Sequence, residues 1–124
     1  MSNQTVERRK HPRKRVSVQS LIANHASRSD CVTVDLSANG LFCRLDHPLS
    51  VFTKVKITLM IPSTEGNLSG NNHLKPVDCE GVVVRSDEEP AGEGLPSYAT
   101  AIFFNRIDDE SVGLIQKYVA SHKH

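Results

Sequence analysis

The sequence is poor in aromatic residues and contains no tryptophan. Phe and Tyr together make up 5% of the chain, too little for the stacking platforms that hold single-stranded nucleic acid. Apolar runs are also short, and none approaches the roughly 18 residues of a membrane-spanning helix. The first ten residues, MSNQTVERRK, lack the apolar core of a signal peptide. We therefore expect a cytoplasmic protein without membrane insertion.

Cysteine and histidine are present without the spacing that metal sites require. The three cysteines Cys31, Cys43 and Cys79 include no C-x-x-C pair, and each lies in an apolar or alternating run, so we expect buried free thiols. The six histidines form neither H-E-x-x-H nor a Cys/His zinc pattern. No G-x-S-x-G, P-loop or G-x-G-x-x-G is present. The sequence predicts no enzyme, no metal and no cofactor.

Charge is distributed unevenly along a chain of one-domain length, 124 residues. The formal net charge is only +1, yet segment 7–15 alone carries +5, which leaves −4 for the remainder. We expect a basic arm over residues 1–15 on a mildly acidic body over 16–124. This arrangement suits a local anionic ligand better than broad coating of nucleic acid.

Period-2 alternation of apolar residues runs through most of the body and predicts β-strands. Predicted core positions in three segments are Val16, Val18 and Ile22; Leu41, Cys43 and Leu45; and Val55, Ile57, Leu59 and Ile61. The segments VDCEGVVVR and SYATAIFF predict two more strands. In DCVTVDLS, the alternation predicts Val32, Val34 and Leu36 on the core face, with Thr33, Asp35 and Ser37 opposite.

Turn residues and a change of period mark the remaining segments. SANG (37–40) ends in Asn-Gly, which is typical of a tight turn. Residues 62–73 and 87–96 are polar and rich in Gly, Asn or Pro, and we expect long loops there. Helical spacing then appears at about 108–121, with Asp108 or Asp109 as the N-cap. Short antiparallel strands followed by one helix predict a small barrel with a helix across it.

Two motifs suggest a binding site. The first is RKHPR, in which three residues separate Arg9 from Arg13; Pro12 disfavours a regular helix there. Guanidinium groups bind phosphate oxygens and guanine O6/N7 in a bidentate geometry. The second is DLSANG (35–40), where an outward Asp35 can accept hydrogen bonds from guanine N1–H and N2–H₂. Gly40 permits an unusual backbone angle or the close approach of a ligand.

In their order and spacing, R-x-x-x-R (9–13) and D-x-S-x-x-G (35–40) resemble the PilZ domain family of cyclic di-GMP receptors. The resemblance extends from about Glu7 to Tyr118. It implies a mainly β fold, a six-stranded antiparallel barrel with a C-terminal helix. It also implies the ligand-binding residues Arg8, Arg9, Arg13, Asp35, Ser37 and Gly40. Arg44 and Arg85, near the same strands, are expected as auxiliary cations.

The sequence departs from the family pattern at two places. A glycine that family members often carry on the last strand is Ala101 here. Some members stack an aromatic side chain on the ligand from a neighbouring strand, and Val83 is the expected equivalent. These departures leave open whether one or two ligand molecules bind.

The resemblance implies a cyclic di-GMP receptor that orders its N-terminal arm on binding and signals to a protein partner. Motility, exopolysaccharide synthesis and biofilm control are the processes it suggests, and the sequence does not separate them. Two alternatives remain open: a ligand-independent adaptor of the same fold, and a nonspecific nucleic-acid-binding module.

Overall fold

The computed structural model describes residues 14–63, 73–90 and 94–121. Within these ranges the chain forms a series of strands followed by a helix. The elements are β1 (Lys14–Ala23), β2 (Arg28–Leu36), β3 (Gly40–Leu45), β4 (Lys54–Ser63), β5 (His73–Glu89), β6 (Ser97–Arg106) and α2 (Asp109–Ser121). The strand β1 begins two residues before the expected start of the body, so Lys14 and Arg15 belong to the sheet and not to the arm.

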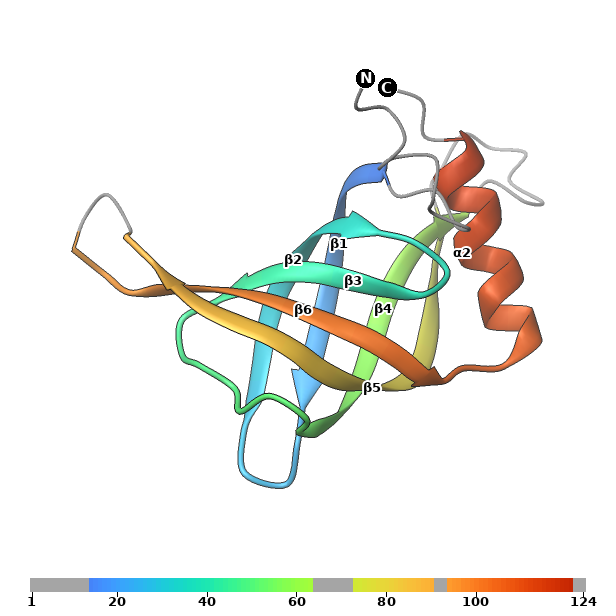
Figure 1. Cartoon of the computed structure of the whole chain (residues 1–124). Coiled ribbons are helices and arrows are strands. Elements are labelled where there is room, and N and C mark those ends of the chain that lie inside the picture. The colour runs from blue at the N-terminus through green and yellow to red at the C-terminus, as the bar shows by residue number, and fades with distance from the viewer. Residues whose placement is uncertain (1–13, 64–72, 91–93, 122–124) are drawn as a thin grey trace, which may run out of the picture.

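The strands close into an antiparallel barrel in the order β1-β2-β3-β6-β5-β4 (Figure 1). Every neighbouring pair is antiparallel, including β1 with β4, which completes the ring. Closure leaves no long unpaired strand edge within the described residues. The expected six-stranded barrel with a C-terminal helix is thus the fold that forms.

Alternating apolar side chains fill the barrel, as the period-2 patterns of β3 and β4 predicted. Along β4 the side chains of Val55, Ile57, Leu59 and Ile61 are at most 2% exposed. The β3 residues Leu41, Cys43 and Leu45 are also buried. On β5, burial raises the pKa of the Cys79 thiol to about 12, so this thiol stays protonated and inert at neutral pH.

The helix α2 packs against the barrel alongside β4 (Figure 1). Asp108 caps its N-terminus, since Oδ1 accepts a 2.7 Å hydrogen bond from the backbone amide of Ser111. Hydrogen bonds from Ser111 also lower the pKa of the Asp108 carboxyl. Ile115 and Val119, one turn apart, point into the core cluster. The helix is therefore held by one apolar stripe and a capped first turn.

Gly113 lies on the exposed side of this helix, where a Cβ atom would meet nothing within 4 Å. Glycine in a helix interior is about 1 kcal/mol less favourable than alanine, because its unfolded chain has more freedom to lose. Gly113→Ala is therefore expected to raise the free energy of unfolding by about 1 kcal/mol. Urea denaturation monitored by circular dichroism measures this, and a decrease would contradict the open surroundings of Gly113.

Two strand pairs extend further than the loop composition predicted. Pairing of β4 with β5 continues to Ser63 and His73, and pairing of β5 with β6 continues to Glu89 and Ser97. The loop expected over 87–96 was therefore wrong at residues 87–89, which form the end of β5. This part of β5 and β6 projects from the barrel as a two-stranded ribbon (Figure 1). The ribbon carries acidic residues on a strand beside the candidate site.

Candidate functional site

Asp35 reaches the outer surface of the barrel through an irregularity in β2. The pairing of β2 with β3 shifts register between Thr33, opposite Cys43, and Asp35, opposite Phe42. The extra residue, Val34, reverses the alternation, so Thr33 and Leu36 both face inward and are fully buried. The expectation that Val32 faces the core was wrong: its side chain is 36% exposed. Asp35 lies outward, as expected, but for this different reason.

The inward Thr33 is accommodated by hydrogen bonding. Its hydroxyl lies 2.7 Å from the Ser20 hydroxyl, which in turn donates to the Val18 carbonyl at 2.9 Å. Both hydroxyl groups are buried and both are satisfied, which removes the penalty of an unpaired polar group in the core. The bulge that turns Asp35 outward is therefore stabilised from inside the barrel.

Ser37 is buried in the turn after β2 and does not lie on the open strand face, contrary to expectation. It is 5% exposed, and its Oγ accepts a 3.1 Å hydrogen bond from the Asn39 amide. Its own amide donates to the Gly40 carbonyl at 3.0 Å. These bonds fix the turn that follows Asp35. Ser37 thus shapes the site by holding this turn.

Gly40 is required by the neighbouring strand. A Cβ atom here would overlap the Ile102 carbonyl oxygen of β6 and lie 3.2 Å from the Phe103 Cα. Its φ lies outside the left-handed region, so conformational freedom is not the reason for glycine. The close approach is secured by a 2.8 Å hydrogen bond from the Phe104 amide to the Asn39 carbonyl. Gly40 therefore lets the turn join β6.

Cross-strand register continues the outer surface from Asp35 to Arg85. Asp35 pairs with Phe42, Phe42 with Ala101, and Ala101 with Arg85, across β2, β3, β6 and β5. Directly opposed residues share one face of a sheet. We call Asp35, Phe42, Ala101 and Arg85 the outer row. At its β1 end, Arg15 is the register partner of Asp35.

Phe42 is the residue in this row that motif reasoning missed. Its ring is half-buried beside Asp35, and the Arg44 guanidinium lies 5.2 Å from the ring centroid. The signal was present in the sequence, because the alternation of GLFCRL places Phe42 and Arg44 opposite the core. Val83, expected as the aromatic equivalent, is 0% exposed and belongs to the core, so that expectation was wrong. Phe42 supplies an aromatic surface on the outer row.

The two expected auxiliary cations are each paired with a carboxylate of the β5 ribbon. Arg44 Nε lies 3.0 Å from Glu89 Oε1, and Arg85 Nε lies 2.9 Å from Asp87 Oδ2. Their side chains are 51% and 68% exposed. Exposed pairs of this kind contribute only about 0.2–1 kcal/mol. A phosphate group can therefore displace these carboxylates at little cost.

A polar hollow of about 440 Å³ adjoins Arg44 between β2 and β3. Arg28 and Cys31 line it from β2, and Asp46 and His47 follow β3. The His47 ring contacts Asp46 at 2.8 Å, and this hydrogen bond lowers the pKa of the Asp46 carboxyl. In the parts of the chain that the structure describes, no three His, Cys, Asp or Glu side chains gather to hold a metal ion.

The remaining site residues expected from the sequence, Arg8, Arg9 and Arg13, lie outside the described residues. In the structure, Asp35 and Arg85 lie in one row across the strands, and Arg44 lies beside Phe42. Ser37 and Gly40 lie at the turn between β2 and β3. Over the described residues, no helix is long and apolar enough to span a bilayer.

Residues 7–121 match the PilZ domain. The chain belongs to the PilZ domain family. The matched range includes the R-x-x-x-R segment (9–13) and the D-x-S-x-x-G motif (35–40), and it reaches the last residue of α2. No curated protein sequence matches this PilZ chain.

Solved PilZ structures share this fold at low sequence identity. MotI (DgrA), an inhibitor of motility from Bacillus subtilis, has a TM-score of 0.73 and 17% identity, over 92% of this chain and 50% of MotI. The PilZ domain of Escherichia coli YcgR, solved with c-di-GMP, has a TM-score of 0.63 and 14% identity, over 92% and 90%. The MrkH–c-di-GMP complex from K. pneumonia has a TM-score of 0.67 and 18% identity, over 91% and 50%.

The TM-scores establish a common fold. This chain spans half the length of MotI and of MrkH, and nine-tenths of the isolated YcgR domain.

Proposed function

We propose that this PilZ chain is a receptor for cyclic di-GMP. The observation that carries the proposal is the outward Asp35 beside Phe42, on a face whose β1 edge continues directly into the R-x-x-x-R segment. Arg15 pairs with Asp35, and covalent geometry keeps the Cα of Arg13 within about 8 Å of that of Arg15. A ligand on Asp35 is thus within reach of the arginines.

Each residue has a role that its chemistry suits. The Asp35 carboxylate accepts hydrogen bonds from guanine N1–H and N2–H₂, while Phe42 offers a flat apolar surface to the base. Arg9 and Arg13 bind the phosphates and guanine O6/N7, with Arg8 as a further cation. Ser37 and Gly40 hold the turn that fixes Asp35. Arg44 and Arg85 exchange their ribbon carboxylates for the ligand's phosphate oxygens.

Ligand binding would then fix the N-terminal segment against the outer row. A dianion held by both halves of the site joins two parts of the chain that the sequence separates by some twenty residues, which creates a new surface for a protein partner. Since the ligand is an intracellular second messenger, this role places the protein in the cytoplasm. The YcgR and MrkH structures, both of complexes with c-di-GMP, support the choice of ligand.

Ligand selectivity separates this function from nonspecific nucleic-acid binding. We expect cyclic di-GMP to displace a bound fluorescent cyclic di-GMP analogue. GMP, which offers one guanine and one phosphate, should require at least a tenfold higher concentration for the same displacement. Single-stranded RNA of about 20 nucleotides should compete poorly. An RNA-binding module would instead bind RNA best, with an affinity that falls steeply with salt because many phosphates are contacted.

The ligand-independent adaptor predicts a third result, in which the analogue does not bind at all. The same titration thus distinguishes three functions. Competition by RNA, or absence of binding, would each contradict the receptor.

A further inference from the structure

The opposite end of the barrel has a gap between β1 and β4. Their pairing stops at Ala23 and Lys56, where β1 ends. The chain then turns at Asn24, whose Oδ1 accepts hydrogen bonds from the amides of Ala26 and Ser27, both at 2.8 Å. Lys54 and Val55 still pair with β5, but no described strand pairs with them on the β1 side. A short stretch of β4 edge is left open.

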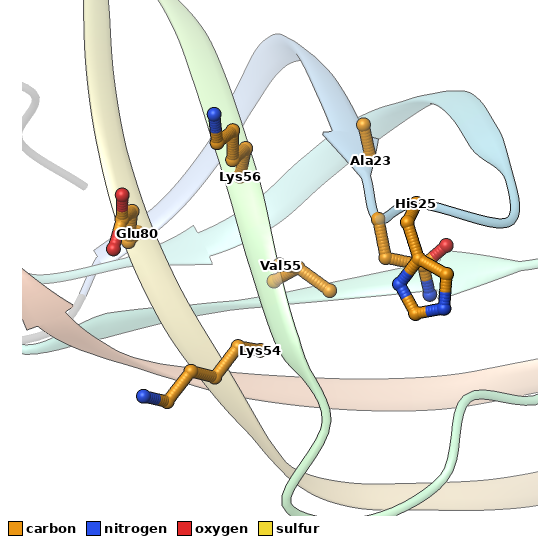
Figure 2. A pocket seen from close by; sticks show the side chains of 7 residues that line it. Ala23, His25, Lys54, Val55, Lys56 and Glu80 are labelled. Carbon is orange, nitrogen blue, oxygen red and sulfur yellow. The ribbon is translucent and has the colours of Figure 1, made fainter.

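A cavity of about 380 Å³ occupies this gap (Figure 2). Ala23 and Val55 give it an apolar floor, and Lys54, Lys56, Glu80 and His25 surround it. In Figure 2, Lys54, Lys56 and Glu80 extend from β4 and β5, while His25 lies across the gap on the β1–β2 hairpin. The cavity falls at the lower end of the size range of ligand pockets, about 300–1,000 Å³, and has room for a large apolar side chain with polar groups around it.

Positive charge predominates at this cavity. Lys54 and Lys56 are exposed, and no ion pair to either is formed by the described residues. Glu80 is the single carboxylate of the lining. Two lysines and a histidine around one carboxylate favour a ligand with acidic groups.

Phe52, two residues before Lys54, has an unusual backbone. Its φ of 77° lies in the left-handed region, which costs a non-glycine residue about 1–2 kcal/mol. The conformation is held by a 2.7 Å hydrogen bond from its amide to the Val83 carbonyl. The side chain is nevertheless 79% exposed, and that of Val51 is 46% exposed. The fold thus accepts strain at a position where an aromatic side chain gains almost no burial.

We propose that this end of the barrel binds an acidic, extended segment of a partner protein. The docking surface consists of Lys54, Lys56 and His25, which line the cavity, together with the exposed Val51 and Phe52, which precede β4. An apolar side chain of the segment fills the cavity, acidic side chains pair with the lysines, and Phe52 packs against the segment from outside. The open edge of β4 provides main-chain hydrogen bonds for an extended chain.

A concave apolar pocket and a carboxylate at its rim favour a peptide over an anionic membrane, which would require neither. The cavity shares no lining residue with the candidate ligand site and lies far from Asp35, although Lys54 pairs with Val82, three residues before Arg85. Arg15, opposite Asp35, and Ala23 lie at the two ends of β1, about 26 Å apart along the strand. The inference therefore stands whether or not cyclic di-GMP binds.

The test starts from a library of random twelve-residue peptides displayed on phage, selected on the full chain. We expect enrichment of peptides with several acidic residues around one large apolar residue. Synthesised and titrated into ¹⁵N-labelled protein, they should shift the amide signals of His25 and residues 52–56. The double variant Lys54→Glu/Lys56→Glu should weaken binding at least tenfold, because attraction becomes repulsion.

Two further variants make the result specific. Phe52→Gly relieves the backbone strain, so it should fold at least as stably as the wild type while binding the peptide more weakly. Lys75→Glu/Lys117→Glu makes the same change in net charge elsewhere and should leave the affinity unchanged.

Three outcomes would overturn the proposal: enriched peptides without acidic residues, amide shifts confined to the Asp35 face, or no enrichment. Binding to phosphatidylglycerol vesicles that is lost in the lysine variant, without peptide binding, would assign the surface to a membrane instead.

Discussion

Gly40→Val is expected to lower the free energy of unfolding by about 3 kcal/mol. A side chain at this position would overlap the Ile102 carbonyl, a backbone atom that cannot move without breaking the pairing of β3 with β6. Overpacking in a tight site typically costs about 1–3 kcal/mol, and the cost is highest where the obstacle is backbone. Gly40→Ala should fall in the same range, nearer its lower end. Urea denaturation of the purified variants measures the loss.

This prediction separates two roles for the glycine of D-x-S-x-x-G. If Gly40 served only to admit a ligand, Gly40→Ala would fold normally and lose only cyclic di-GMP binding. The structural role predicts that Gly40→Ala lowers the free energy of unfolding of the ligand-free protein. Gly113→Ala is the matched control, because the same substitution meets no neighbour there. Equal stability of Gly40→Ala and the wild type would contradict the structural role.

Asp35→Ala and Arg13→Ala are each expected to weaken cyclic di-GMP binding about 5- to 150-fold. These factors correspond to about 1–3 kcal/mol for each lost set of base or phosphate hydrogen bonds. Asp35 is half-buried, and no hydrogen bond or ion pair joins its side chain to another residue whose side chain the structure describes, so Asp35→Ala should leave the barrel stable. Calorimetric titration of each variant measures the affinity.

Asp78→Ala is the control for Asp35→Ala. Asp78 is an exposed carboxylate on β5, paired with Thr58 on β4 and remote from the outer row. The Asp78→Ala variant should bind cyclic di-GMP with the affinity of the wild type. If Asp35→Ala also binds normally, the Asp35 carboxylate does not hydrogen-bond to the guanine, and the proposed site is misplaced.

Simple alternation predicted the barrel well where the strands are regular. Along β4 and β3 every predicted core residue is buried, because neither strand contains an extra residue over those positions; the extra residue of the β2–β3 pairing lies in β2. In β2 the same rule failed at Val32 and Thr33. One extra residue reverses all the faces beyond it, and a bulge is set by the neighbouring strands, which the sequence of β2 does not contain. The buried Ser20–Thr33 hydrogen bond illustrates that dependence.

The candidate site shows the same limit. Asp35 was placed on the surface by alternation, whereas the need for glycine at position 40 arises from Ile102, more than sixty residues later in the chain. Val83 was chosen as the ligand-facing residue by analogy, but it faces the core because it continues the inward alternation of Val77 and Cys79. The register shift between Val83 and Arg85 instead turns Arg85 outward. The outward position of Phe42 could be predicted from the alternation of β3. The ion pairs of Arg44 and Arg85 could not be predicted, since they depend on the ribbon formed by residues 87–89.

The most direct test of the receptor is isothermal calorimetric titration of the full chain with cyclic di-GMP. The account predicts saturable heat with one or two ligand molecules per chain, and the fitted molar ratio decides between them. It further predicts that the same titration of Arg13→Ala gives a markedly weaker isotherm. Absence of saturable heat with the wild-type chain, or an unchanged affinity in Arg13→Ala, would contradict the account.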